Sequence, residues 1–210
     1  MEKDIFTGSS IKDELDLKKC MTQIEFGYLD NEDNIHYEID SEFRDGFVLQ
    51  SPRILMKSFV GTCFDEVELI RKFFEEKEIE CKTFFIMAKG AGTVQNHAFV
   101  AVQSEDSWAW FENYWKEFEG IHYYISKERL IKDVYDKFLS KCGRISTIGV
   151  YEYSKPEYGI SYGDYLEHCL SGELVHSNKR TENSERPTIP SIFMAKSMKD
   201  KLENENKEGK

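Results

Sequence analysis

Cys63, His97 and Glu112 are the residues of this chain best suited to chemistry. Cys63 lies in GTCFDEVELIRKFF (61–74), His97 in NHAFVAVQ (96–103) and Glu112 in SWAWFENYW (107–115). A thiol becomes a nucleophile when an imidazole takes its proton, and a carboxylate can fix the tautomer of that imidazole. The three residues therefore predict a Cys–His–Glu triad, provided that the fold brings their segments together.

The segment around Cys63 is typical of a helix that begins at Thr62 and ends near Lys77. Thr62 can act as the N-cap, and Asp65 three residues later completes a variant of the capping box. Cys63 would then lie in the first turn, where free N–H groups and the positive end of the helix dipole stabilise a thiolate. Gly61 lets the backbone turn and lets a substrate approach. We expect the apolar residues to form a buried stripe, made of Val67, Ile70, Phe73 and Phe74. The charged residues should form a solvated outer face, made of Glu68, Arg71, Lys72, Glu75 and Glu76.

Two strands separated by the turn SEDS (104–107) predict an antiparallel hairpin that carries the histidine and the acid. A turn centred on Glu105–Asp106 pairs Gln103 with Trp108. Side chains alternate along a strand, so His97 and Glu112 would share one face, a diagonal step apart. Asn113 would point the other way, so Glu112 rather than Asn113 is the expected partner of the ring.

The remaining pattern indicates a mixed α+β domain. The segment Lys82–Ala88 is nearly continuous in apolar residues, which favours a central strand. Further elements are expected as follows: helices from Pro52 after the cap Ser51, over Lys127–Lys141 after the cap Ser126, and over Ile160–Cys169; a strand over Ile145–Tyr153; and a hairpin or loop over 26–39.

Charge and composition divide the chain into a domain over residues 1–176 and a polar, mostly disordered tail over 177–210. The net charge is −11; the tail has 8 Lys+Arg and 6 Asp+Glu, so it contributes +2 and leaves −13 for the domain. A domain this acidic argues against binding to nucleic acid phosphates or to anionic lipid. A protein or peptide is the expected partner.

The sequence also favours a cytoplasmic protein without a metal or cofactor. No apolar run approaches the roughly 18 residues that a membrane span needs, and MEKDIFTGSS has no signal-peptide pattern. The five cysteines are odd in number and irregularly spaced, which fits reduced thiols. The absence of a CxxC or HxxxH pair argues against zinc.

Four segments together resemble the transglutaminase-like domains of bacterial proteins, within the papain-like superfamily of thiol enzymes. They are GTCFDEVEL (61–69), KTFFI (82–86), NHAFV (96–100) and WFE (110–112), and the likeness covers roughly residues 20–140. The resemblance implies a nucleophile-bearing helix packed on an antiparallel sheet, with Cys63 as nucleophile, His97 as general base and acid, and Glu112 in the place usually held by Asp. It implies acyl transfer or hydrolysis at amide bonds, and we assign Gly61, Asn96 and Trp110 to substrate binding. No upstream Gln or Trp is identified as the oxyanion donor.

Three alternatives remain open on the sequence. The same fold can serve as a binding module, for which the aromatic strand Trp108–Trp115 would suit a peptide groove. The Cys, His and Glu could instead hold a metal, although no fourth ligand is evident. A cell-wall amidase would use the same thiol chemistry but would require export or lysis.

Overall fold

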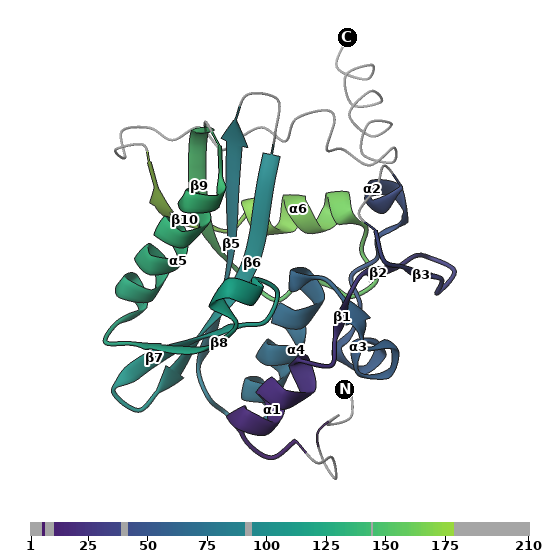
Figure 1. Ribbon diagram of the computed structural model, residues 1–210, viewed down its shortest axis with the longest axis horizontal. Helices are drawn as coiled ribbons and strands as arrows, with labels where there is room; N and C mark the ends of the chain where they lie inside the picture. The colour runs from purple at the N-terminus through teal and green to yellow at the C-terminus, as the bar shows by residue number, and fades with distance from the viewer. Residues whose placement is uncertain (1–5, 7–10, 39–41, 91–93, 144, 179–210) are drawn as a thin grey trace.

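A computed structural model describes residues 6, 11–38, 42–90, 94–143 and 145–178 (Figure 1). The helices are α1 (Glu14–Met21), α2 (Phe43–Gly46), α3 (Pro52–Ser58), α4 (Cys63–Glu75), the 3-10 helix η1 (Lys116–Phe118), α5 (Lys127–Lys141) and α6 (Tyr162–Leu170). The strands are β1 (Glu25–Phe26), β2 (Tyr28–Leu29), β3 (Ile35–His36), β4 (Val60–Gly61), β5 (Cys81–Gly90), β6 (Val94–Ser104), β7 (Ser107–Glu112), β8 (Gly120–Tyr124), β9 (Ile145–Tyr153) and β10 (Glu173–Ser177). The predicted mixed α+β class is confirmed.

A six-stranded sheet in the order β10-β9-β5-β6-β7-β8 forms the centre of the fold, and every neighbouring pair in it is antiparallel. The apolar segment expected to be central lies in β5, between β9 and β6. The hairpin is confirmed as well, because Gln103 of β6 pairs with Trp108 of β7. Its register follows from the short turn between the two strands.

Helices cover the sheet on both faces (Figure 1). The face that carries Phe85, Ala98 and Val100 packs against α4 and α6, with α1 and α3 completing that core. The opposite face, with Phe84 and Phe99, packs against α5. Alternate residues of a strand thus feed two separate cores, as pleating requires.

Helix α4 begins as predicted but buries more of its surface than expected. The Thr62 hydroxyl accepts a hydrogen bond from Phe64 N–H, and Asp65 accepts from Thr62 N–H, so the capping box is formed. The prediction that Glu68 and Arg71 face solvent is wrong, because they are 0% and 6% exposed. They pair with each other, and Arg71 also donates to the Thr83 hydroxyl at 2.6 Å. Mutual pairing is what makes such buried charges tolerable.

The last strand of the sheet was not predicted. Strand β10 pairs with β9 and ends at Ser177, one residue beyond the expected domain boundary. The rest of the expected tail, from 179 onward, lies outside the described residues.

Candidate active site

Cys63 is the first residue of α4 and lies against strand β6. Strand β7 pairs with β6 over Ala101–Ser104, and none of the described strands pairs with the preceding part of β6 on that side. The Cys63 sulfur accepts a hydrogen bond from the backbone N–H of Ala98, the residue after His97. The start of the helix and the histidine strand therefore meet at the sulfur, although 34 positions separate Cys63 and His97 in the sequence.

His97 and Glu112 form a buried pair, as the hairpin register predicted. His97 Nε2 lies 2.9 Å from Glu112 Oε2, and both side chains are 2% exposed. Burial disfavours ionisation of Glu112, but the charge and hydrogen bond of His97 outweigh it, and the pKa of this carboxyl is lowered. An ionised carboxylate only accepts, so Nε2 carries the hydrogen and donates it. Glu112 Oε1 accepts a second hydrogen bond from Trp115 N–H at 2.8 Å.

The other ring nitrogen of His97 is buried and makes no hydrogen bond with the described residues. In a neutral imidazole whose Nε2 holds the hydrogen, Nδ1 is the basic nitrogen. Among the described residues, Nδ1 forms no hydrogen bond with the Cys63 thiol. The sulfur accepts its hydrogen bond from the Ala98 N–H. His97 thus keeps one ring nitrogen without a partner among the described residues, and the next residue in the sequence, Ala98, donates to the sulfur.

Two aromatic residues that follow Glu112 cover the histidine. The Trp115 ring stacks on the His97 ring with centroids 4.1 Å apart and an angle of 18° between the planes. The Tyr114 ring is tilted against His97 at 5.8 Å and packs edge-on against Phe26 at 5.3 Å. These contacts fix the imidazole plane and keep water from it. The sequence shows several aromatic residues close to Glu112, but it does not predict that Trp115 stacks on His97.

The thiol of Cys63 is protonated in this conformation, contrary to the expectation of a thiolate at the helix end. Cys63 is 6% exposed. Burial raises its pKa well above the usual value, the bond from Ala98 N–H opposes this, and the nearby carboxyls Glu66, Glu112 and Asp65 raise it further. The favourable helix end is outweighed because desolvation penalises the charged form.

Glu66 is a third acid close to Cys63, and the sequence did not identify it as part of the site. Its raised pKa lowers the negative charge of the site. Burial and the charge of Glu112 raise its pKa to about 8, against the lowering effect of its hydrogen bond with Asn113. At neutral pH Glu66 is therefore mostly uncharged. The Asn113 amide donates to Glu66 Oε1 at 2.8 Å and to the Met21 carbonyl at 3.0 Å. Asn113 thus bridges α4 and α1 and is not the partner of His97, as expected.

The three residues assigned to substrate binding have different surroundings. Trp110 is fully buried, with its ring 4.9 Å from that of His122 and 6.3 Å from that of Trp115, which argues against a role in binding substrate. Gly61 is also buried, and a Cβ there would lie 2.6 Å from Leu55 Cδ1. The space next to Gly61 is therefore filled by the Leu55 side chain, which leaves no room there for a substrate. Asn96 is half-buried, and its amide donates to the Tyr162 hydroxyl at 2.9 Å.

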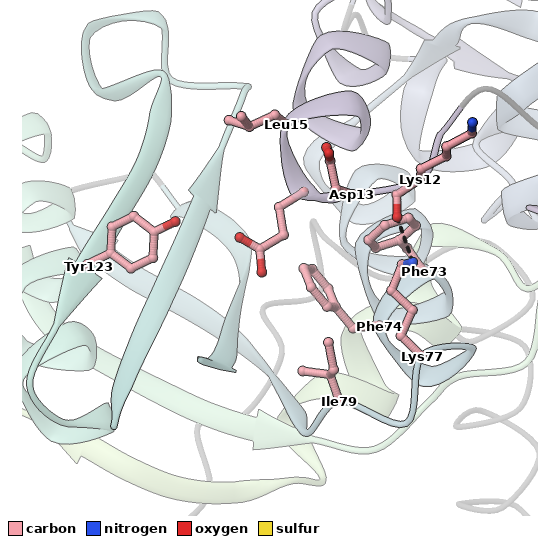
Figure 2. Close-up of a pocket in the computed structure, with 9 residues that line it drawn as sticks. Lys12, Asp13, Leu15, Phe73, Phe74, Lys77, Ile79 and Tyr123 are labelled. Atoms are coloured by element: carbon pink, nitrogen blue, oxygen red, sulfur yellow. Dashed lines mark hydrogen bonds between the residues drawn. The ribbon is translucent and has the colours of Figure 1, made fainter. Parts of the chain in front are cut away.

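A surface pocket of about 460 Å³ lies at the far end of α4, away from Cys63 (Figure 2). Phe73, Phe74 and Ile79 provide its apolar surface, with Tyr123 of β8 on the opposite wall. Lys77 Nζ donates to the Lys12 carbonyl at 2.8 Å and lies over the Phe73 ring. None of the predicted site residues lines this pocket.

Neither a protein-family model nor a curated protein sequence matches this chain. Within the described residues, no group of three or more His, Cys, Asp or Glu side chains is arranged to hold a metal ion. None of the helices in the described part of the chain is long and apolar enough to cross a membrane.

Proposed function

We propose that this chain is a thiol enzyme that transfers or hydrolyses acyl groups at amide bonds, on a fold of the papain/transglutaminase type. The observation that carries the proposal is the buried His97–Glu112 pair, in which His97 directly precedes Ala98, the residue whose N–H is hydrogen-bonded to the Cys63 sulfur. A helix-start thiol, a ring oriented by a carboxylate and a dry setting are the parts that nucleophilic acyl transfer requires. Support from the fold is the packing of α4 on an antiparallel sheet.

In the proposed reaction, Cys63 gives its proton to His97 Nδ1 and its sulfur attacks the carbonyl carbon of an amide. A C–S bond forms while the π electrons of the carbonyl move to its oxygen. Collapse of this intermediate restores the carbonyl and breaks the C–N bond, and His97 returns the proton to the departing amine. Water or a second amine then attacks the thioester, with His97 again acting as base and acid. Glu112 stabilises the imidazolium at each stage.

We propose that the substrate is a basic protein or peptide. We also propose that the enzyme works in a reducing compartment such as the cytoplasm. All five cysteines are free, including the half-buried Cys81 and Cys142. Reduced thiols in these numbers fit a reducing environment. The acidic charge of the domain would favour the approach of a cationic segment.

Acetylation by p-nitrophenyl acetate tests the proposed function. The full chain should release p-nitrophenol and acquire an acetyl group on Cys63, located by peptide mass spectrometry. Cys63→Ser should abolish the rapid release, whereas Cys142→Ser, which removes a half-buried thiol on the other side of the sheet, should leave it unchanged. Equal acetylation of Cys63 and Cys142 would contradict the proposal.

A catalytically silent binding module is the second candidate, and the burial of the site favours it. Cys63, His97 and Glu112 are 6%, 2% and 2% exposed, and the pocket in Figure 2 lies elsewhere. In that case the His97–Glu112 pair would serve stability alone. Full resistance of Cys63 to both acetylation and alkylation in the folded protein would support this second function over the first.

A further inference from the structure

Tyr162, the first residue of α6, lies where the start of α4 meets strand β6. Its hydroxyl accepts a hydrogen bond from the Asn96 amide at 2.9 Å, and Asn96 directly precedes His97. Its ring lies 6.0 Å from that of Phe64, the residue directly after Cys63. Tyr162 therefore contacts the neighbour of the predicted base and the neighbour of the predicted nucleophile.

The hydroxyl of Tyr162 has a hydrogen to give. Since Asn96 donates to its oxygen, the O–H hydrogen remains available, and no described residue accepts it. Tyr162 is 5% exposed, and an unused donor in so dry a setting is costly unless something else is to receive it. Burial raises the pKa of Tyr162, the Asn96 bond opposes the rise and the Cys63 charge adds to it, so the hydroxyl keeps its proton at neutral pH.

Other candidate donors near Cys63 are engaged or unsuitably placed. Gln50, which precedes Cys63 in the chain, donates one amide hydrogen to the Val60 carbonyl at 2.8 Å and accepts a hydrogen bond from the Ser58 hydroxyl at 3.1 Å, so its amide is held toward those residues. Burial raises the pKa of the Tyr114 hydroxyl, the charges of Cys63, Glu66 and Glu112 raise it further, and the Glu112 carboxylate would repel a second negative charge there. The Ala98 N–H is already bonded to the sulfur. Tyr162 is the remaining donor, and the charge of Cys63 acts on its hydroxyl.

We propose that the Tyr162 hydroxyl, oriented by Asn96, donates a hydrogen bond to the substrate carbonyl oxygen as that oxygen becomes negative. This inference rests on the proposed function and supplies the side-chain oxyanion donor that the sequence did not reveal. As the C–S bond forms, the carbonyl π pair moves to oxygen and is stabilised there by the phenolic hydrogen. The hydrogen stays on Tyr162, and the interaction weakens when the carbonyl is restored.

Two reagents separate this role from a structural one. Acetylation of Cys63 by p-nitrophenyl acetate passes through an oxyanion, whereas alkylation by iodoacetamide displaces iodide at a CH₂ carbon and needs no oxyanion donor. Tyr162→Phe removes only the hydroxyl. It should lower the acetylation rate about 10²- to 10³-fold, the usual effect of losing one such donor, and change the alkylation rate less than about twofold.

Tyr165→Phe is the matched control, because it removes another buried hydroxyl from the same helix, one that is bonded to Tyr153. It should leave the ratio of acetylation to alkylation unchanged. If Tyr162→Phe fails to fold, as judged by its thermal unfolding, Asn96→Ala takes its place and should lower that ratio about tenfold by releasing the hydroxyl.

The outcomes distinguish the two proposals. Rapid acetylation of Cys63 in the unaltered chain together with an unchanged ratio in Tyr162→Phe would overturn the role of Tyr162 and leave the proposed function standing. No acetylation of Cys63 in the unaltered chain would overturn both. A selective loss of acetylation in Tyr162→Phe, with alkylation preserved, is the result that we expect.

Discussion

The two ends of helix α4 differ in almost every physical respect. At its start, Cys63, Asp65 and Glu66 are buried. At its end, Phe73 and Phe74 contribute to a pocket of about 460 Å³ whose wall includes the exposed Tyr123. Cys63 is the first residue of the helix, whereas the pocket lies at its other end (Figure 2).

This difference separates the pocket from the residues to which we assign the proposed chemistry. The pocket end holds mixed charges and apolar surface but no orphaned base and no thiol. The closed end holds an unpaired ring nitrogen, an unused phenolic hydrogen and three acids that interact with the Cys63 thiol. Unspent hydrogen-bonding capacity in a buried place requires an explanation, and a reacting substrate provides one.

Removing the carboxylate from the closed end should have the largest effect. Glu112→Gln keeps the size of the side chain but no longer fixes the His97 tautomer, so the acetylation rate of Cys63 should fall about 10²- to 10⁴-fold. The release of p-nitrophenol measures it. Glu117→Gln changes an acid in η1 that pairs with Lys141 and should leave the rate unaltered. Equal rates for the two variants would remove Glu112 from the triad.

Gly61→Ala should disturb the cap that positions Cys63. The added Cβ would lie 2.6 Å from Leu55 Cδ1 and 3.3 Å from Asp65 Cβ. Overpacking of this kind should lower the free energy of unfolding by about 1–3 kcal/mol in chemical denaturation. In Gly143→Ala the new Cβ would meet no atom of the described residues within 4 Å, so that variant should remain within about 0.5 kcal/mol of the original protein. Similar losses in both would show that the packing at Gly61 is unimportant.

Glu66→Gln should change how stability depends on pH. The pKa of Glu66 is raised from 4.5 to about 8, so between these values the folded chain holds a proton that the unfolded chain has lost. Stability therefore falls as the pH rises through this window, with a slope of at most about 1.4 kcal/mol per pH unit for one proton. The neutral Gln lacks this dependence.

Denaturant unfolding of both proteins from pH 4 to 9 measures the effect. The two stability curves should lie close together near pH 4 and separate up to about pH 8, with Glu66→Gln the more stable protein at the alkaline side. The variant keeps a residual slope, because the pKa values of Asp65 and Glu68 are also raised, to about 6 and about 7. Parallel curves over the whole range would contradict a neutral, buried Glu66.

Tyr123→Ala tests the pocket end and should have the smallest effect. The side chain is 60% exposed, so its loss should change the free energy of unfolding by about 0.5 kcal/mol or less. The acetylation of Cys63 should be unchanged, because Tyr123 lines the pocket at the other end of α4. A marked loss of acetylation would show that the two ends of α4 work together.

Local patterns predicted the elements well. The N-caps Ser51, Thr62, Ser126 and the strand alternation around His97 depend on neighbouring residues, and each is found in the structure. The short turn fixed the register that brings Glu112 to His97. These features could be predicted because their causes lie within a few residues of one another in the chain.

Features that arise from tertiary packing could not be predicted. The burial of Glu68 with Arg71 depends on Thr83 and Tyr153, which a helical periodicity does not take into account. The raised pKa of the Cys63 thiol comes from desolvation by several elements together. Tyr162 reaches Asn96 across 66 positions of sequence, and no local signal marks that contact.

The pH profile of Cys63 alkylation tests the central claim most directly, because it asks whether sulfur and imidazole act as one unit. Iodoacetamide labelling of Cys63, followed by mass spectrometry from pH 5 to 10, should give a lower apparent thiol pKa in the unaltered chain than in His97→Ala, with labelling of Cys142 as the internal reference. Superimposable Cys63 profiles in the two proteins would contradict the account.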